Sequence, residues 1–237
     1  MDEQEALTQL RSLVVRGDGR GLVNRLSQEP WPPHPLQLIG DGLVAAVREG
    51  VEGAAGLAMT CAEKLSERDW EGDERLAQTL RAALGSGPTP MLRPLPVDLE
   101  ELTTVLEGDP VQGGGRIDLA TGEVWPDFVL DDAEEAGDGD EDDDDPDRWL
   151  PVDCEGSRSS YHDMVLFIDD LNDASFADRL SRAISGRGAF RRFKDRLSER
   201  PELLTRWFAF ADDRQRGRAR SWLAEEGYTP TRPPTGG

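Results

Sequence analysis

The run Gly186-Arg-Gly-Ala-Phe-Arg-Arg-Phe-Lys-Asp195 predicts a sharp corner between two helices. Gly186 follows an amphipathic stretch that reaches Ile184, so it stands where a helix needs a C-terminal cap, and glycine readily adopts the positive φ of such caps. Gly188 stands at the start of the next helix, where Phe190 and Phe193 recur at helical spacing. We therefore expect a helix–turn–helix corner with a packed inner face.

The outward side of this corner is basic. The start of a helix presents free N–H groups and a partial positive charge, so it attracts anions. The residues that we predict as an anion- or partner-binding site are Arg187, Gly188, Arg191, Arg192, Lys194 and Arg196. In the alternative interpretation these arginines are internal salt-bridge partners of acidic neighbours: Asp169, Asp170, Asp178 and, for Arg191, Asp195.

A secondary basic cluster follows. Arg214 and Arg218 are four residues apart and therefore share one face of a predicted helix. The alternative is an ordinary solvated helix face.

Apolar residues recur at helical spacing through most of the chain. Residues 1–84 carry four such stripes, interrupted by the Pro-rich stretch at 30–35, and further stripes follow after Ser157. Asp98 and Asp173 are each placed to cap a helix. Alternating apolar residues flank Ala120-Thr-Gly122, which is typical of a β-hairpin, and Trp149-Leu-Pro-Val152 predicts a third strand.

The sequence thus predicts a mainly α protein with a small antiparallel β element, an α+β fold. We expect an all-helical bundle over residues 1–88 and a linker over 89–97, where Pro and Gly are frequent. A module of a three-stranded sheet and about five helices would cover 98–228. Residues 229–237 would form a disordered tail.

The chain is acidic, but its charge is unevenly distributed. Its formal net charge is −21, and residues 127–147 hold 13 Asp or Glu and no Lys or Arg. Such a segment predicts a disordered loop. We consider three roles for it: a solubilising linker, a competitor that folds over the basic corner, and a weak divalent-cation site, although the spacing of a calcium loop is missing.

Six motifs occur in order along the second half of the chain: Ile117-Asp-Leu-Ala-Thr-Gly-Glu-Val124, Trp149-Leu-Pro-Val152, Tyr161-His-Asp-Met164, Arg182-Ala-Ile-Ser-Gly-Arg-Gly-Ala-Phe-Arg-Arg-Phe-Lys-Asp195, Trp207-Phe-Ala-Phe210 and Trp222-Leu-Ala-Glu-Glu-Gly227. With these motifs the chain resembles the bacterial uncharacterised protein family 0158 over residues 95–227. The resemblance implies a small strand layer followed by helices, and no function. Residues 1–90 and the long acidic insert depart from the family pattern.

Motifs for catalysis are scarce. The sequence has two histidines, and it lacks a nucleotide-binding glycine loop, a dinucleotide fingerprint and zinc-ligand spacing. We therefore expect no catalytic residues, no metal and no cofactor. A hydrolase that uses His162, with Asp163 or Cys154 nearby, is the remaining enzymatic alternative.

The start of the chain is acidic, and no apolar run is long enough for a membrane span. Together these observations predict a non-enzymatic cytoplasmic interaction protein that binds a polyanion or an acidic partner through its arginine-rich corner. Nucleic acid is one such partner, and a membrane is not expected. The alternative is a protein–protein adaptor or structural protein whose arginines form internal salt bridges.

Overall fold

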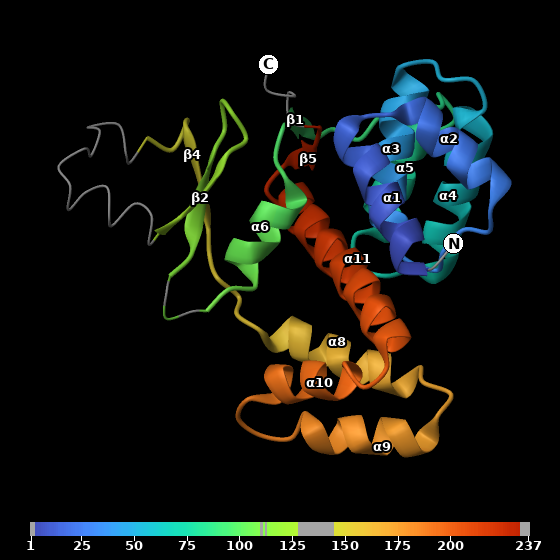
Figure 1. Ribbon diagram of the computed structural model, residues 1–237. Helices are drawn as coiled ribbons and strands as arrows, with labels where there is room; N and C mark the ends of the chain where they lie inside the picture. Colours follow the sequence, from blue (N-terminus) through green and yellow to red (C-terminus); the bar gives the residue numbers. More distant parts are fainter. Residues whose placement is uncertain (1–2, 110, 112, 128–144, 233–237) are drawn as a thin grey trace. The chain divides into compact units, whose positions relative to one another are not determined.

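The structure is a computed structural model that describes residues 3–109, 111, 113–127 and 145–232 (Figure 1). Within these residues it contains ten helices, a three-stranded antiparallel sheet and a two-stranded parallel sheet. The predicted mainly α fold with a small antiparallel β element is therefore confirmed. The chain divides into two compact units, one made of Met1–Pro90 and Ser160–Gly217 and the other of Met91–Ser159 and Arg218–Gly237.

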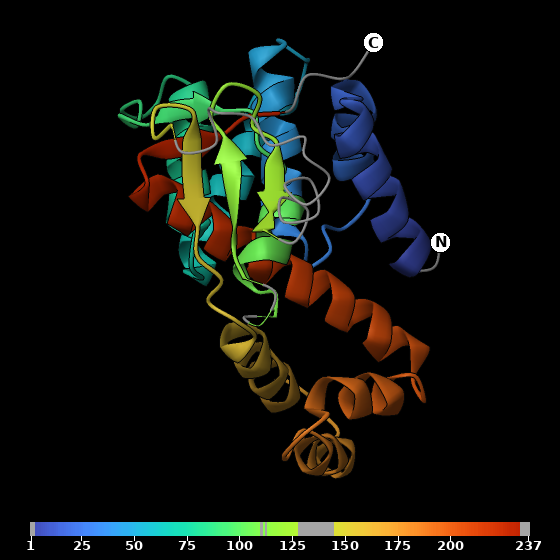
Figure 2. The same cartoon turned by 90° about the vertical axis from the view of Figure 1, so that its left-hand side faces the viewer.

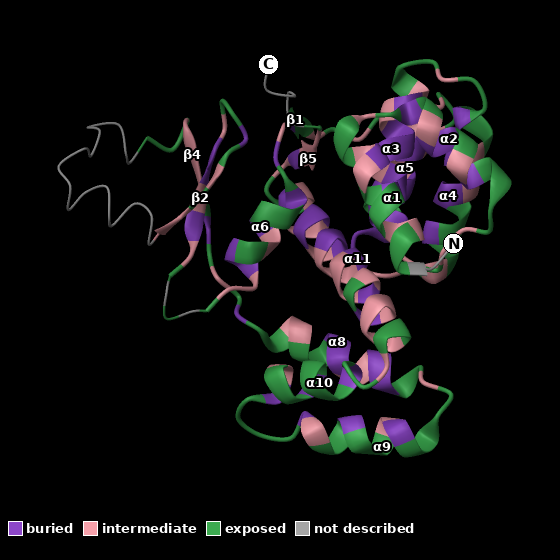
Figure 3. Cartoon of the chain, in the orientation of Figure 1, coloured by how far each residue is buried: buried purple, intermediate pink, exposed green. Residues whose placement is uncertain are grey.

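Five helices form the amino-terminal part of the first unit. They are α1 (Glu3–Arg16), α2 (Gly19–Gln28), α3 (Leu36–Arg48), α4 (Ala54–Arg68) and α5 (Asp73–Ala83). Helix α3 contacts each of the other four, and two of its apolar side chains, Ile39 and Leu43, are fully buried. Helix α2 lies between the first two predicted stripes, and Asp18 caps it by accepting a hydrogen bond from the Gly21 N–H. A common apolar core holds this bundle together (Figure 3).

The first unit continues with α8 (Arg158–Asp169), α9 (Ala174–Ala183), α10 (Ala189–Leu197) and the start of α11 (Pro201–Glu225). Their core is aromatic: Phe167, Phe193, Trp207 and Phe210 make mutual ring contacts, with the Phe193 and Trp207 centroids 4.8 Å apart. The stripes that predict separate helices near 203–211 and at Trp222 lie on one continuous helix, α11.

This division differs from the predicted limits at 88 and 98. The change of unit at Pro90 falls within the predicted linker, but Ser160–Gly217 groups with the amino-terminal helices instead of with the sheet. One physical reason is a close backbone approach inside the first unit. A Cβ added to Gly217 would collide with the carbonyl oxygen of Glu71, and one added to Gly72 would collide with that of Gly217. Two glycines therefore let α11 lie directly against the start of α5.

The second unit combines α6 (Leu99–Leu106), the last turns of α11 and both sheets. Strand β1 (Arg93–Leu95) pairs in parallel with β5 (Tyr228–Pro230), so part of the predicted linker and of the predicted tail is a two-stranded sheet. Asp98 caps α6 by accepting from the Glu100 N–H at 2.8 Å, as the sequence predicts. The core of this unit includes Leu95, Leu102 and Leu223.

The three-stranded sheet has the order β3-β2-β4 and is seen face-on in Figure 2. Its strands are β2 (Gly115–Asp118), β3 (Val124–Pro126) and β4 (Trp149–Val152), which confirms the predicted hairpin and third strand. Ile117 at the centre of β2 is fully buried against the core of the second unit. Residues 128–144, and with them most of the predicted acidic loop, lie outside the described residues.

Both edge strands of this sheet carry a proline at an outward-facing backbone position. The Asp127 N–H bonds to the Gly114 carbonyl and the Asp118 N–H to that of Glu123, so the pair Gly115–Pro126 between them is not hydrogen-bonded. By the same alternation the nitrogen of Pro151 points away from β2. Each proline therefore removes an N–H donor from a free edge of the sheet. A further strand can form fewer hydrogen bonds with that edge as a result.

Candidate functional site

The corner at Gly186–Asp195 has the predicted backbone. Gly186 and Gly188 have φ values of +81° and +76°, and α10 starts directly after Gly188. Phe193 and Leu197 face the aromatic core and are fully buried, as their spacing predicts. Asp173 caps the preceding helix α9 through the Phe176 N–H at 3.0 Å. The local sequence pattern therefore predicts the backbone of the corner correctly.

Arg192 of the predicted site is part of the corner itself. Its guanidinium group donates to the carbonyl oxygens of Ala183 and Ser185, both at 2.8 Å, and to that of Arg187. These are backbone groups at the end of α9 and in the turn, which have no partner within the helix. Arg192 thus caps the C-terminus of α9, and its guanidinium group donates its hydrogen bonds within the fold.

The other basic side chains of the corner are largely exposed. Arg196 binds Glu199 at 2.8 Å, and Arg191 lies 3.8 Å from Asp195 with 89% of its side chain exposed. The Lys194 ammonium lies 6.0 Å from the ring centroid of Phe208, which is itself half exposed. The side chain of Arg187 makes no hydrogen bond or ion pair with any residue in the described part of the chain.

Both arginines of the predicted secondary cluster are paired with carboxylates. Arg214 belongs to the first unit and is ion-paired there with Asp163, whose side chain is buried. Arg218 belongs to the second unit and binds Glu107 at 2.6 Å. Both side chains are mostly buried beside their carboxylates. Each of them therefore holds its own unit together.

A buried polar network in the first unit was not predicted. Its centre is Arg68 at the end of α4, which binds Asp73 through two hydrogen bonds of 2.7 and 2.8 Å and also contacts Asp213. Both carboxylates are fully buried. The network is held from a third side by Gln37, whose side chain donates to Asp73 at 2.8 Å. One guanidinium group therefore binds two carboxylates that are 140 residues apart in the sequence, Asp73 of α5 and Asp213 of α11.

Asp213 also replaces a missing helix cap. Pro35 at the N-cap of α3 offers no side-chain hydrogen bond, but the Asp213 carboxylate accepts from the Gln37 N–H at 2.7 Å. The Nδ1 atom of His34 lies 3.4 Å from the same carboxylate. A negative charge at this helix N-terminus is favourable because the N–H groups there lack partners.

Aromatic rings enclose this network. The guanidinium group of Arg68 lies 4.1 Å from the ring centroid of Trp70, and Arg214 lies 5.1 Å from the same ring. His34 stacks on Trp70, and Phe210 meets both rings edge-on at centroid distances of 5.3 Å. Ion pairs flanked by these aromatic rings thus join the bundle of residues 1–90 to the carboxy-terminal helices of the first unit.

The pKa values reflect this enclosure. Burial favours the neutral form of Asp213, but the hydrogen bond from His34, the charge of Arg68 and the Gln37 N–H outweigh it and lower the pKa of Asp213. Burial likewise opposes the charge of Arg68, but Asp73 and Asp213 raise its pKa. Burial raises the pKa of the Cys61 thiol, so this cysteine is neutral and unreactive. These shifts favour the charged forms of both Asp213 and Arg68.

A sequence signal for Asp213 existed in the apolar stripe of α11. Trp207, Phe210 and Asp213 follow one another at steps of three, so the carboxylate stands where a buried apolar residue is expected. Such a position predicts a buried charge with a partner, because an unpaired carboxylate would not be tolerated there. The identity of the partner, Arg68, has no signature in the sequence.

Two residues of the enzymatic alternative, His162 and Asp163, lie in different environments. His162 is exposed on α8, whereas Asp163 is buried and its carboxylate binds Arg214. Within the described ranges no group of three His, Cys, Asp or Glu residues is arranged to hold a metal ion. Among the helices described, none has the length and apolar character needed to cross a membrane.

Comparison with known proteins finds similarity over the second half of the chain. The model of an uncharacterised protein family, UPF0158, matches residues 119–232. The UPF0158 protein PA5073 of Pseudomonas aeruginosa is 29% identical over 145 residues, which cover 59% of this chain and 88% of that protein. No solved structure matches the chain. The matched region contains the three-residue step from Trp207 to Asp213, the corner at Gly186–Asp195 and strand β4. The family match and this relative together support membership of residues 119–232 in the uncharacterised protein family UPF0158.

Proposed function

We propose that this chain is a non-enzymatic cytoplasmic binding protein that contacts a polyanion or an acidic partner through α10. The surface concerned, which we call the α10 basic surface, consists of Arg191 and Lys194 on α10 and of Arg187 in the turn before it. It is narrower than the site expected from the sequence, because Arg192 serves the corner and Arg196 is paired with Glu199.

The observation that carries this proposal is the different use of neighbouring basic residues. Arg192 is anchored by several carbonyl groups, whereas Arg191 one position earlier has only a long contact to Asp195 and is almost fully exposed. Lys194 lies beside Phe208, whose ring is half exposed. Exposed cations next to an exposed aromatic ring favour binding of an anionic surface, since neither group contributes much to the fold.

A second candidate function is that of an adaptor or structural protein. It is favoured by the ion pairs of the other arginines, among them Arg206 with Asp170, Arg214 with Asp163 and Arg218 with Glu107. These pairs resemble the internal salt bridges of the structural interpretation, although their acidic partners differ from most of those expected.

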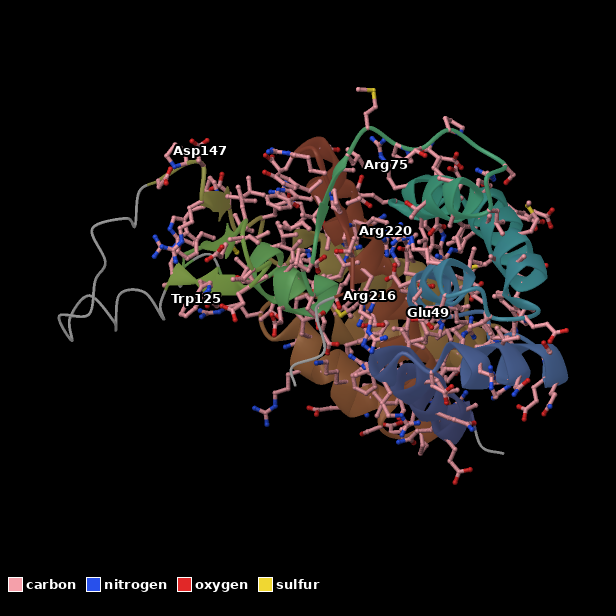
Figure 4. The ribbon with its side chains drawn as sticks, turned by 90° about the horizontal axis from the view of Figure 1, so that it is seen from above. Glu49, Arg75, Trp125, Asp147, Arg216 and Arg220 are labelled. Carbon is pink, nitrogen blue, oxygen red and sulfur yellow. The ribbon has the colours of Figure 1, made fainter. Side chains whose placement is uncertain are left out.

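The proposal is tested by fluorescence anisotropy with three labelled probes: a single-stranded RNA, polyphosphate and a poly-glutamate peptide. The test variant combines Arg187→Ala, Arg191→Ala and Lys194→Ala. The control variant combines Arg48→Ala, Arg75→Ala and Lys64→Ala, which removes the same charge from exposed positions of α3, α5 and α4; Arg75 is labelled in Figure 4. We expect the test variant to lose binding of at least one probe and the control to retain it.

Salt dependence and the acidic segment provide further readouts. If three phosphates of the single-stranded RNA are contacted, the logarithm of the binding constant should fall with the logarithm of the salt concentration with a slope of about 2. Changing the ten acidic residues of 131–144 to their amides, which we call the neutralised variant, should tighten binding. Equal loss of probe binding in the test and control variants would show that binding depends only on net charge, and it would overturn the proposal. Absence of binding even in the neutralised variant would favour the adaptor.

A further inference from the structure

The three-stranded sheet of the second unit has one face that does not contact the core. Gly115, Ile117 and Val152 point toward the core. Successive side chains of a strand alternate between faces, so the opposite face carries Arg116, Asp118, Trp125, Trp149 and Pro151. The register agrees, since Arg116 lies opposite both Trp125 and Pro151, and Asp118 lies opposite Trp149. We call this surface the outer sheet face.

The two tryptophans of the outer sheet face are used differently. The ring of Trp149 is covered by guanidinium groups of the chain itself, that of Arg116 at 4.2 Å from the centroid and that of Arg148 at 4.8 Å. Trp125, labelled in Figure 4, is 37% exposed and has no cation over its ring among the described residues. The same face thus presents one tryptophan that already binds guanidinium groups and one that is open.

The charge around this face favours a cationic occupant. Within the described residues 113–127 and 145–155 there are two basic residues, Arg116 and Arg148, and seven acidic ones, a net charge of 2 − 7 = −5. Both of these basic side chains are engaged with Trp149. A polyanion would meet repulsion here, whereas lysine and arginine side chains would be attracted.

The mode of binding is restricted by the edges of the sheet. Pro126 and Pro151 each remove an outward N–H donor, so a partner strand cannot extend the ladder at these positions. An occupant must therefore use side chains on the face. Trp125 and Glu123 are suited to this: the hydrogen bond from the Asp118 N–H to the Glu123 carbonyl continues the ladder, which puts Glu123 on the same face as Trp125.

We propose that the outer sheet face docks an arginine-rich peptide segment of a partner protein, with one guanidinium group stacked on Trp125 and a neighbouring one paired with Glu123. Arginine fits this place better than lysine because its planar group stacks on an aromatic ring and also donates to a carboxylate. This site lies in the other unit from the α10 basic surface and binds the opposite charge, so it is independent of the function proposed above.

The test uses the full-length chain and a labelled nonapeptide of alternating arginine and glycine, with binding followed by anisotropy. The neutralised variant serves as the background for all proteins, because it removes ten negative charges that would attract any polycation. We expect Trp125→Ala to weaken binding about tenfold. The matched control is Tyr161→Ala, which removes another exposed aromatic ring, and it should leave the affinity unchanged.

Further variants keep the test decisive if Trp125→Ala disturbs the sheet. Glu123→Gln changes an exposed side chain and should weaken binding several-fold, whereas Trp125→Phe should retain part of the affinity. A peptide with citrulline in place of arginine should not bind, and a lysine peptide should bind more weakly.

Other outcomes would overturn the proposal. Equal affinities of Trp125→Ala, Glu123→Gln and the parent would show that attraction is nonspecific. Binding of single-stranded RNA that depends on Trp125, without peptide binding, would identify a nucleic acid as the occupant. Concentration-dependent self-association that Trp125→Ala abolishes, again without peptide binding, would identify a second copy of the chain.

Discussion

We expect Asp213 to contribute more to the stability of the first unit than any exposed charged residue does. It meets Arg68, the Gln37 N–H and His34 at once, and it is fully buried. Changing Asp213 to Ala leaves a buried guanidinium group with half of its partners and an uncapped helix. We expect a loss of about 3–5 kcal/mol in the free energy of unfolding, measured by urea denaturation. Asp195→Ala, which breaks only the exposed contact to Arg191, should change it by at most about 0.5 kcal/mol.

The lowered pKa of Asp213 predicts a specific pH dependence. A carboxylate whose folded-state pKa lies below its unfolded value stabilises the fold above the unfolded value, which is about 3.9 for aspartate. That contribution is lost as the pH falls toward the folded-state pKa. The wild type should therefore lose stability between about pH 5 and pH 2 more steeply than Asp213→Asn, as seen in urea denaturation at each pH. Parallel curves for the two proteins would contradict this assignment.

Arg192 and Arg191 are neighbours with opposite expected behaviour. Arg192→Ala leaves several carbonyl groups at the end of α9 without a donor, and it should lower the free energy of unfolding by about 1–3 kcal/mol. Arg191→Ala should leave stability unchanged within about 0.5 kcal/mol and affect only binding. Thermal melts followed by circular dichroism distinguish the two. Equal melting temperatures of both variants would mean that the corner does not depend on Arg192.

At the scale of the elements, Gly217 tests how closely α11 approaches the start of α5. Alanine inside a helix is usually better than glycine by about 1 kcal/mol. Gly217→Ala should nevertheless destabilise the protein, by about 2 kcal/mol or more, because its Cβ would collide with the Glu71 carbonyl. In the control, Gly56→Ala in α4, the added methyl group meets open space and should be neutral or stabilising. A stabilising Gly217→Ala would disprove the close approach.

The elements also show what the sequence can predict. The hairpin, the third strand, the caps at Asp98 and Asp173 and the glycine turn at 186–188 all depend on neighbouring residues, and all of them occur as expected. The pairing of β1 with β5 joins segments about 135 residues apart and has no local signal. The separate roles of Arg191 and Arg192 likewise depend on the turn that brings the end of α9 within reach of only one of them.

At the scale of the whole molecule, we expect the net charge to determine how stability depends on salt concentration. Of the formal charge of −21, ten negative charges lie in residues 131–144. Self-repulsion destabilises a compact chain, and salt screens it. We expect the melting temperature of the wild type to rise between 10 and 150 mM NaCl, and that of the neutralised variant to be higher at low salt and to change less. A wild-type melting temperature that does not depend on salt would argue against this effect.

The discontinuous composition of both units has a consequence for synthesis on the ribosome. The polar network of the first unit needs Asp213, and the parallel strand pair of the second unit needs Tyr228–Pro230, so neither unit is complete until these residues have been synthesised. Because a ribosome adds residues one after another from the amino terminus, Arg68 and Asp73 emerge long before their partner carboxylate. The nascent helical bundle must therefore remain soluble with an incomplete charge cluster, and a stalled or truncated product should be a target for chaperones and proteases rather than a folded fragment.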